Sequence, residues 1–469
     1  MSVNREGSTY DLVVIGGGSA ASAAAAEALR LGKSVAKVQD GPIAGTCLNV
    51  GCIPSKTLLI AAADHARARR ARFQGVNTFA GTVDLRALVA DKEDFLDTLR
   101  RNQVEAAKTA GFADYRGRAS FVADHTTELV RIRIDTPDGV EELQGSEVII
   151  ATGADSFIPP IPGLDSIDYL TSASAMALET LPASLLVIGG NAIGLEQAQL
   201  FSDLGTRVTV IEIAARIAPL EDPEMSTALQ GALASQGMQF VTNAHVSEVS
   251  RTQEGVVMRL RVDGQQRELT ADAVLVATGR RPLTDSLNLG AIGIETGSRG
   301  EVPVDENLRT VHPHVWAAGD VTGQAQFVYV ATAQGRAAAA NALGNSALAL
   351  DYANLPRVTF TSPPIASVGL TAAQAMEQGI EVDVRRLDMA WVSRALVNRE
   401  TDGLLKLVTD RASGRIIGAQ MVGHEAGEII AAAGFLASAG VTVQQLGDAW
   451  APYLTMMESL QLIARTPAE

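Results

Sequence analysis

The chain has 469 residues, of which 47% are hydrophobic and 19% are charged. A chain of this length holds two or three domains, and its apolar content is sufficient for a large core, which excludes a disordered protein. The formal charge of −15 argues against nucleic acid as a partner, because binding phosphates requires clustered cations. We interpret the one basic run as a solvated helix face; it contains Arg67, Arg69, Arg70 and Arg72.

Cysteine content and apolar runs indicate the compartment. Two cysteines in so long a chain are too few for a secreted disulfide scaffold. The N-terminal sequence MSVNREGSTY is polar and lacks an apolar signal segment. The apolar stretch at 429–441 is shorter than the roughly 20 residues of a membrane span. We therefore expect a soluble, cytoplasmic protein without a membrane partner.

The first predicted elements form a dinucleotide-binding unit. An apolar strand at 11–15 precedes a glycine-rich turn, an alanine-rich helix to residue 31 and a second strand at 34–38. Gly16 allows the tight turn, Gly18 lets the backbone approach a pyrophosphate, and Ala21 permits close helix–strand packing. The helix N-terminus supplies N–H groups and a positive dipole end for the phosphates.

A second unit of the same kind follows. A strand at 185–188 leads into Gly189 and Gly194, a helix to about residue 204, and a strand at 207–211. Glu212 ends that strand, where a carboxylate accepts hydrogen bonds from a ribose. Asn191 replaces the middle glycine, so this turn alone is a weaker indication than the first. Two such units in one chain predict two bound dinucleotides.

Three further apolar strands end in glycine turns, and the pattern then changes. Segments 148–154 and 274–282 both run into Ala-Thr-Gly, and 315–320 ends in Gly-Asp. The two Ala-Thr-Gly segments are interpreted as crossings between two nucleotide-binding domains. From about residue 346, mixed strands and helices indicate a separate α+β domain. The predicted fold class is α/β, with two Rossmann-like domains and this C-terminal domain.

The most specific feature is the segment GTCLNVGCIPSK at 45–56. Two cysteines five positions apart are consistent with a metal half-site, a structural disulfide or a redox-active pair. A zinc site needs two further Cys or His ligands, and the histidines lack suitable spacing. These histidines are His65, His125, His245, His312, His314 and His424. A helix expected to begin here lowers a thiol pKa, which favours the redox-active pair.

This segment resembles the active-site motif of the flavoprotein pyridine nucleotide–disulfide oxidoreductases, and the resemblance extends over essentially the whole chain. It implies that FAD and NAD(P)H are the cofactors. Cys47 would meet the substrate, Cys52 would lie beside the flavin, and Lys56 would lie near the flavin N5 and pair with Glu196. The C-terminal domain would form a homodimer whose partner subunit completes each active site.

The resemblance also implies the domain boundaries and the cofactor contacts. The FAD domain would comprise 1–155 and 282–345, the NAD(P) domain 156–281, and the interface domain 346–469. The predicted nucleotide contacts, beyond the two glycine turns and Glu212, are Gln39, Asp40, Gly45, Thr46, Lys56, Thr152, Gly153, Gly279, Arg280, Gly319 and Asp320. Gln39 stands where the family has a glutamate for the FAD ribose, and Lys37 interrupts a usually apolar strand.

Within the family, segments 326–341 and 451–464 are similar to those of mercuric reductases. Tyr453 stands where thiol–disulfide reductases carry a histidine, and Glu458 retains their glutamate. Tyrosine, with a reference pKa of ~10, is a poor base for a thiol but can donate a hydrogen bond or ligate a metal. The vicinal cysteine pair that ends mercuric reductases is not present in this sequence.

We predict an enzyme that reduces Hg(II) or a related soft metal ion, held transiently by Cys47 and Cys52. A disulfide reductase acting on lipoamide or a small thiol, and a redox sensor or electron carrier with little turnover, remain alternatives. Glu212 favours NADH, although Arg216 is close enough in sequence to offer a site for the phosphate of NADPH.

Overall fold

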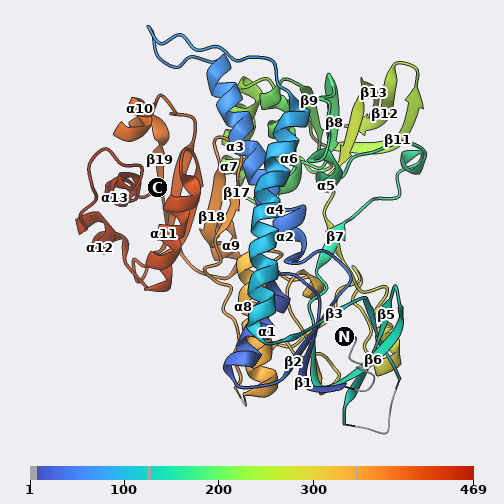
Figure 1. Cartoon of the computed structure of the whole chain (residues 1–469). Coiled ribbons are helices and arrows are strands. Elements are labelled where there is room, and N and C mark those ends of the chain that lie inside the picture. The colour runs from blue at the N-terminus through green and yellow to red at the C-terminus, as the bar shows by residue number, and fades with distance from the viewer. Residues whose placement is uncertain (1–7, 124–127, 345) are drawn as a thin grey trace. The chain divides into compact units, whose positions relative to one another are not determined.

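The computed structural model describes residues 8–123, 128–344 and 346–469 (Figure 1). The chain forms two compact units, each assembled from three separate segments. Unit 1 comprises Met1–Pro54, Ala90–Phe157 and Gly279–Leu350, and unit 2 comprises Ser55–Val89, Ile158–Thr278 and Asp351–Glu469. The predicted limits of the three domains stay a prediction.

Unit 1 is built on a seven-stranded sheet in the order β3-β2-β1-β6-β5-β4, with β16 pairing β6. Its strands are β1 (Ser8–Ile15), β2 (Val35–Gln39), β3 (Ala113–Arg116), β4 (Arg118–Phe121), β5 (Val130–Thr136), β6 (Gly139–Ile150) and β16 (Val315–Ala317). The strands β3, β2, β1, β6 and β16 pair in parallel, whereas β4, β5 and β6 pair antiparallel. The predicted strand–turn–helix–strand unit is confirmed.

Two helices of unit 1 pack unusually closely. They are α1 (Ser19–Arg30) and α8 (Val328–Leu343), which lie side by side (Figure 1). A Cβ on Gly335 of α8 would lie 2.1 Å from the carbonyl oxygen of Ala20, so only glycine permits this approach. Alanine-rich faces therefore bring α8 against the helix that follows the first glycine turn.

One strand of unit 1 is longer than predicted. β6 begins at Gly139, nine residues before the apolar run at 148, and forms a hairpin with β5. The first half of β6 is polar and partly exposed, so the sequence indicates only its buried end as an apolar run.

Unit 2 contains the second nucleotide-binding unit. Its parallel sheet has the order β10-β9-β8-β14. The elements are β8 (Ser184–Ile188), α6 (Ala192–Leu204), β9 (Arg207–Ile211), α7 (Pro223–Ser235), β10 (Gln239–Val241) and β14 (Ala273–Val276). A three-stranded antiparallel sheet adjoins them, formed by β11 (Ala244–Thr252), β12 (Gly255–Val262) and β13 (Gln265–Ala271). The second predicted unit is also confirmed.

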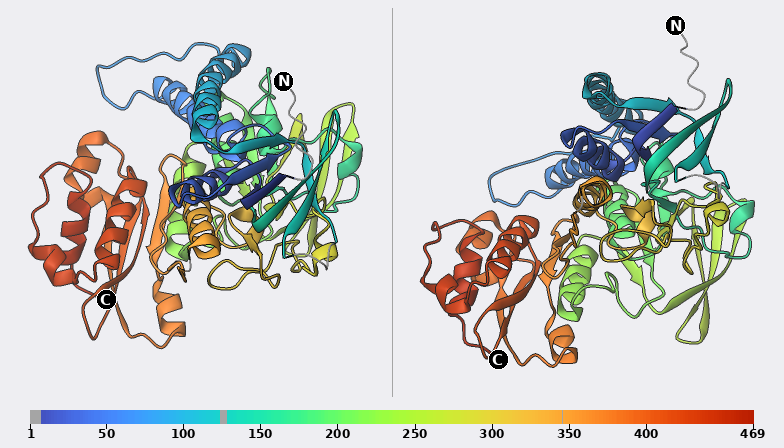
Figure 2. Two further views of the ribbon diagram at one scale, coloured as in Figure 1. Left: turned by 60° about the horizontal axis from the view of Figure 1, so that its bottom comes forward. Right: turned by 90° about the horizontal axis from the view of Figure 1, so that it is seen from below.

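The C-terminal part of unit 2 is an antiparallel sheet covered by helices. The strand order is β17-β18-β21-β20-β19. The strands are β17 (Arg357–Thr359), β18 (Ile365–Gly369), β19 (Val382–Asp388), β20 (Leu404–Asp410) and β21 (Ile416–Val422). The helix α11 (Ala426–Ser438) packs on β18 and β21, and α12 (Val443–Asp448) contacts α13 (Glu458–Arg465). Figure 2 shows these helices in red beside the strands.

The basic run differs from the prediction. The helix α3 (Cys52–Arg69) ends before Arg70 and Arg72, so these two side chains do not lie on a helix face. Arg70 donates to the carbonyl oxygen of Gln236, and Arg72 pairs with Glu400. Both arginines therefore anchor the segment that follows α3 within unit 2.

One helical stretch, at 45–69, is long and apolar enough to cross a membrane by length and composition alone, which the search for uncharged runs overlooked. Such a helix is weak support for a membrane span, because core helices of soluble proteins pass the same test. Leu58 and Ala62 of this helix are buried, and their side chains are part of the core of unit 2.

Candidate functional site

The first glycine turn forms a cradle at the end of β1. Gly16 has φ of +137°, and a Cβ there would lie 2.1 Å from the carbonyl oxygen of Ala151. A Cβ on Gly18 would meet no atom within 4 Å, so this position faces open space at the start of α1. Ala21 is fully buried beneath it. The turn thus offers helix N–H groups and room for a pyrophosphate.

Gln39 lies beside this turn with one polar atom unsatisfied. The side chain is 4% exposed, and its Nε2 donates to Asp114 at 2.9 Å. Its Oε1 has no hydrogen-bond partner, and a Cβ on Gly17 would lie only 2.1 Å from it. A buried acceptor that faces a glycine backbone fits a ribose hydroxyl as donor.

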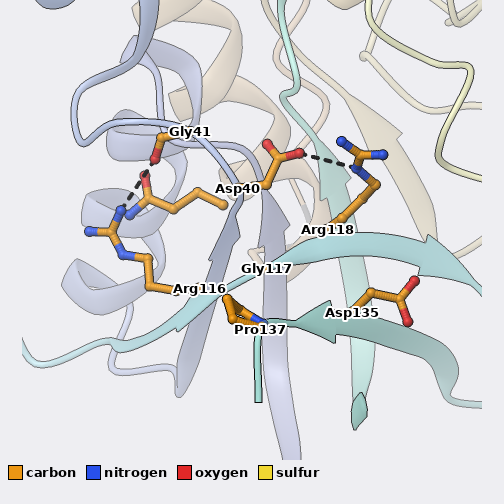
Figure 3. Close-up of a pocket in the computed structure, with 8 residues that line it drawn as sticks. Asp40, Gly41, Arg116, Gly117, Arg118, Asp135 and Pro137 are labelled. Carbon is orange, nitrogen blue, oxygen red and sulfur yellow. Dashed lines mark hydrogen bonds and ion pairs between the residues drawn. The ribbon is translucent and has the colours of Figure 1, made fainter. Parts of the chain in front are cut away.

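A cavity of about 560 Å³ opens next to Gln39 (Figure 3). The residues lining it are Gln39, Asp40, Gly41, Arg116, Gly117, Arg118, Asp135 and Pro137. Asp40 is exposed at the rim and pairs with Arg118 at 3.4 Å. The cavity lies at the carboxyl end of β2, where the adenosine part of a dinucleotide binds in this type of fold. These features fit FAD.

The cysteine motif is bent by residues with left-handed backbone conformations. Ala44, which precedes the short helix α2 (Gly45–Asn49), and Gly45, its first residue, have φ of +66° and +63°. Cys52 is the first residue of α3, and a Cβ on Gly51 would lie 3.2 Å from the Cα of Cys47. Gly51 therefore lets the start of α3 approach Cys47. Thr46 and Cys52 are exposed, and Cys47 is partly exposed.

The same motif packs directly on the first glycine turn. A Cβ on Gly45 would lie 2.7 Å from the Cα of Gly18, so the two glycines are in backbone contact. Two separate predictions, the dinucleotide turn and the redox motif, are thereby joined in unit 1.

Asp320, Arg280 and the two Ala-Thr-Gly turns are further predicted nucleotide contacts. Burial raises the pKa of Asp320, and the charge of Arg280 opposes that shift from 3.6 Å. Gly319 has φ of +84°, and its N–H donates to Gln334 on α8. Thr152 and Gly153 bind the backbone of Leu283, and the carbonyl of Gly279 accepts from the N–H of Phe157. These bonds hold both Ala-Thr-Gly turns in place.

The second glycine turn repeats the geometry of the first. Gly189 has φ of +110°, and a Cβ there would lie 2.3 Å from the carbonyl oxygen of Ala277. A Cβ on Gly194 would lie 1.9 Å from the carbonyl oxygen of Gly189. Glu212 is buried and accepts from the N–H groups of Gly190 and Ala214 at 2.7 and 2.8 Å. Its carboxylate therefore has a fixed orientation beside the turn.

Lys56 and Glu196 form an ion pair of 2.6 Å in unit 2. Glu196 is buried, and its second oxygen accepts from the backbone N–H of Phe360. The ring of Phe360 lies with its centroid 4.7 Å from the Lys56 ammonium. The sequence predicted the ion pair but gave no indication of the aromatic ring.

Glu458 begins α13, and Tyr453 lies in the segment that precedes this helix. Tyr453 is 71% exposed. Glu458 is the first residue of α13, and its carboxylate accepts from the N–H of Leu454 at 3.3 Å. Trp450 nearby is fully exposed. An exposed aromatic surface of this kind is typical of a protein interface.

Among the described residues, no group of three or more His, Cys, Asp or Glu side chains could hold a resident metal ion. His125 lies outside those residues. Sequence reasoning missed Asn49 and Arg100, whose side chains are hydrogen-bonded beside the cysteine motif. Asn49 lies within that motif, but no local sequence pattern indicates its hydrogen bond with Arg100.

Two family models match the chain. Residues 10–335 match the pyridine nucleotide-disulphide oxidoreductase model, and residues 355–464 match the dimerisation domain of the same family. The predicted fold class, with two nucleotide-binding domains and a C-terminal dimerisation domain, is confirmed by these matches and by the structural neighbours.

Individual relatives cover nearly the whole chain. A mercuric reductase of Streptomyces lividans is 44% identical over 97% of this chain and 96% of its own length. One from Bacillus cereus is 42% identical over 99% of this chain and 73% of its own length. The Escherichia coli flavoprotein disulfide reductase RclA, solved as a Cu(II) complex, is 31% identical with a TM-score of 0.86, covering 97% and 99% of the two chains. LpdA of Mycobacterium tuberculosis is 27% identical with a TM-score of 0.87, covering 98% and 99%.

The matches extend over both glycine turns, the cysteine motif and the C-terminal helices. The chain belongs to the pyridine nucleotide–disulphide oxidoreductase family.

Proposed function

We propose that this FAD-dependent oxidoreductase reduces Hg(II) or a related soft metal ion at the Cys47–Cys52 pair, with NADH as the preferred electron donor. The family uses FAD and NAD(P)H. When bound, FAD would supply two-electron redox chemistry between the nicotinamide coenzyme and the Cys47–Cys52 pair. The observation that supports this proposal most directly is the contact of Gly45 with Gly18, which seats the redox motif on the FAD turn.

The chain's own residues have distinct roles in this proposal. Cys52, at the N-terminus of α3, is the thiolate beside the flavin, because the helix dipole and N–H groups favour its ionised form. Cys47 exchanges with the substrate. Lys56, held by Glu196, would supply a positive charge to the flavin. Gly16, Gly18, Gln39 and Asp320 would hold the FAD.

The second glycine turn would bind the nicotinamide coenzyme. Glu212 presents a fixed carboxylate to the 2′- and 3′-hydroxyls of NADH. Arg216 donates from Nη2 to the backbone carbonyls of Pro219 and Glu221, and its buried Nε has no hydrogen-bond partner.

A homodimer completes the site in this proposal. The chain carries a dimerisation domain. Tyr453, exposed on its own subunit, would contact the substrate at Cys47 of the partner subunit, and Glu458 would orient the preceding turn. We propose domain limits of 1–155 with 282–345 for FAD, 156–281 for NAD(P)H and 346–469 for the interface, and we place the enzyme in the cytoplasm.

A metal substrate is favoured over a disulfide. Tyr453 stands where thiol–disulfide reductases have a histidine, so the site lacks the acid–base group that a leaving thiol requires. The mercuric reductases at 39–44% identity support Hg(II). Copper is the second candidate, because the similar RclA is described as a Cu(II) complex.

A panel of electron acceptors tests the proposal. NADH oxidation by the purified enzyme is measured with Hg(II), Cu(II), lipoamide, glutathione disulfide and a quinone. The proposal predicts fast turnover with a metal ion that is lost in Cys47→Ser. Rapid reduction of a disulfide with no turnover of any metal ion would show that the substrate assignment is wrong.

A further inference from the structure

Asn49 lies between the two cysteines and is buried, with 8% of its surface exposed. Its Nδ2 donates to the carbonyl oxygens of Ile43 and Gly45 at 2.8 and 2.7 Å. These carbonyls belong to the bend at 43–45, which leads into the first residue of α2, and Gly45 itself contacts Gly18. The Asn49 side chain therefore closes the bend that seats the cysteine motif on the FAD turn.

The remaining polar atom of Asn49 is bound by Arg100. The Nε of Arg100 donates to Asn49 Oδ1 at 2.9 Å, across 51 positions of the chain. Arg100 lies on the long helix α4 (Leu85–Ala110). Its Nη1 pairs with Asp97 at 2.5 Å and with Glu93 at 3.1 Å on the same helix. Two carboxylates thus fix the guanidinium, and the guanidinium fixes Asn49.

We propose that Arg100 is a positioning residue for the redox-active pair, acting through Asn49 on the bend at 43–45. The inference deepens the proposed function and depends on Cys47 and Cys52 being redox-active. Arg100 does not need to touch the substrate or the flavin for this role. Its effect is to hold α2, and hence Cys47, in one orientation relative to Cys52 and the glycine turn.

Arginine is required here by the geometry of its donors. Its planar group donates from Nε to Asn49 while Nη1 pairs with two carboxylates on a different side. Lysine has a single terminal nitrogen, which cannot serve Asn49 and these carboxylates in the same arrangement. A buried amide that loses its donor leaves an unsatisfied acceptor, and the bend at 43–45 becomes free to shift.

The test compares Arg100→Leu with the wild-type holoenzyme and with Arg101→Leu as a matched control. Arg101 is the next residue on α4, is exposed, and donates to Thr98 rather than to the motif. Three properties are measured: the long-wavelength thiolate–flavin absorbance after two-electron reduction, the alkylation rate of Cys47 by iodoacetamide, and NADH-to-ferricyanide turnover, which does not require the cysteines.

We expect Arg100→Leu to lose at least half of the thiolate–flavin absorbance. The rate of Cys47 alkylation should change about tenfold, because small misplacements of reacting groups have large effects on rate. Ferricyanide turnover should stay within twofold of wild type, and Arg101→Leu should behave as wild type throughout. Unchanged absorbance and alkylation in Arg100→Leu would overturn the inference.

Two further variants separate this role from a general loss of stability. Arg100→Lys keeps the charge and should reproduce most of the defect. In a double-mutant cycle, Asn49→Ala combined with Arg100→Leu should be no worse than Asn49→Ala alone, because both act on one contact. Additive defects would contradict the route through Asn49. A wild-type enzyme without any thiolate–flavin absorbance would instead refute the proposed function.

Discussion

Lys56 donates a hydrogen bond of 2.6 Å to Glu196, which stands 140 positions further along the chain. Glu196 is in turn held by the backbone N–H of Phe360, and the Phe360 ring lies against the Lys56 ammonium. The backbone of residue 360 therefore orients the acid while its side chain stabilises the base. The two effects can be separated, because changing the side chain leaves the N–H in place.

Phe360→Leu should slow reduction of the bound flavin by NADH about two- to fivefold. A cation–π contact at a partly exposed site contributes roughly 0.5–1 kcal/mol, and its loss lets the Lys56 side chain sample other positions. Stopped-flow absorbance measures this rate. Phe360→Tyr keeps the ring and should remain within twofold of wild type. Equal rates for Phe360→Leu and wild type would show that the ring does not contribute.

The two cysteines should differ in their spectroscopic effect. After two-electron reduction, the long-wavelength thiolate–flavin absorbance should disappear in Cys52→Ser and persist in Cys47→Ser. The physical reason is that Cys52 begins α3, where the helix N-terminus stabilises a thiolate. Absorbance that persists without Cys52 would mean that the roles of the two residues are reversed.

The sequence was sufficient to predict the parts of the site that depend on local chain geometry. Gly16, Gly18, Gly189 and Gly194 are required by tight turns, and such turns have a fixed order of residue types. The pairing of Lys56 with Glu196 came from family resemblance rather than from local geometry.

The remaining parts depend on contacts between distant segments. The bond from Arg100 to Asn49 joins residues 51 positions apart, and that from Phe360 to Glu196 spans 164 positions. Neither contact has a local sequence pattern, because helix packing brings Arg100 to Asn49 and a backbone N–H, which any residue but proline carries, binds Glu196. The polar half of β6 was missed for a related reason: its hairpin with β5 stabilises it without an apolar run.

The enzyme should prefer NADH over NADPH by at least about tenfold in kcat/KM, equivalent to 1.4 kcal/mol. The Glu212 carboxylate accepts from ribose hydroxyls and repels a 2′-phosphate. Glu212→Gln keeps an acceptor for the turn but removes the charge, so it should relax the preference. Steady-state kinetics with both coenzymes measures the ratio. Equal or better kcat/KM with NADPH in wild type would contradict this assignment.

Asp203 should make the protein less stable as the pH rises. Burial raises the pKa of Asp203 from 3.8 to about 6, although the charges of Arg70 and Arg69 oppose the shift. The folded state therefore binds the proton more tightly than the unfolded state. The stability from this group is fully present below about pH 4 and is lost as the pH rises through about 6.

Asp203→Asn, which stays neutral, should accordingly raise the melting temperature by roughly 2–4 °C at pH 7.5 and by less at pH 4.5. Differential scanning calorimetry at the two pH values measures the difference. Asp64→Asn is the control, because Asp64 is exposed and pairs with Arg67 on the same helix. A gain that is the same at both pH values would contradict the titration of Asp203.

Mercury turnover should depend strongly on the ligand that carries the metal. Hg(II) bound by thiols is transferred when an attacking thiolate reaches it, and Cys47 and Cys52 are the only cysteines in the sequence. We expect fast turnover with small ligands and slow turnover with bulky thiol complexes. A vicinal cysteine pair introduced after Ala468 should raise the Hg(II) turnover with bulky thiol complexes and leave the turnover with small ligands unchanged. No difference between ligand sizes would show that Cys47 is directly accessible.

Tyr453→Phe should lower Hg(II) turnover several-fold while NADH-to-ferricyanide turnover stays within twofold of wild type. Tyr453 is 71% exposed on its own subunit, and in the proposed dimer its hydroxyl donates to or ligates the substrate at the partner's cysteines. The change removes one oxygen and keeps the ring, so packing at the interface is retained. Trp450→Phe, which alters a fully exposed neighbour, is the control for interface effects. An equal loss of both activities would mean that Tyr453 maintains the dimer rather than contacting the metal.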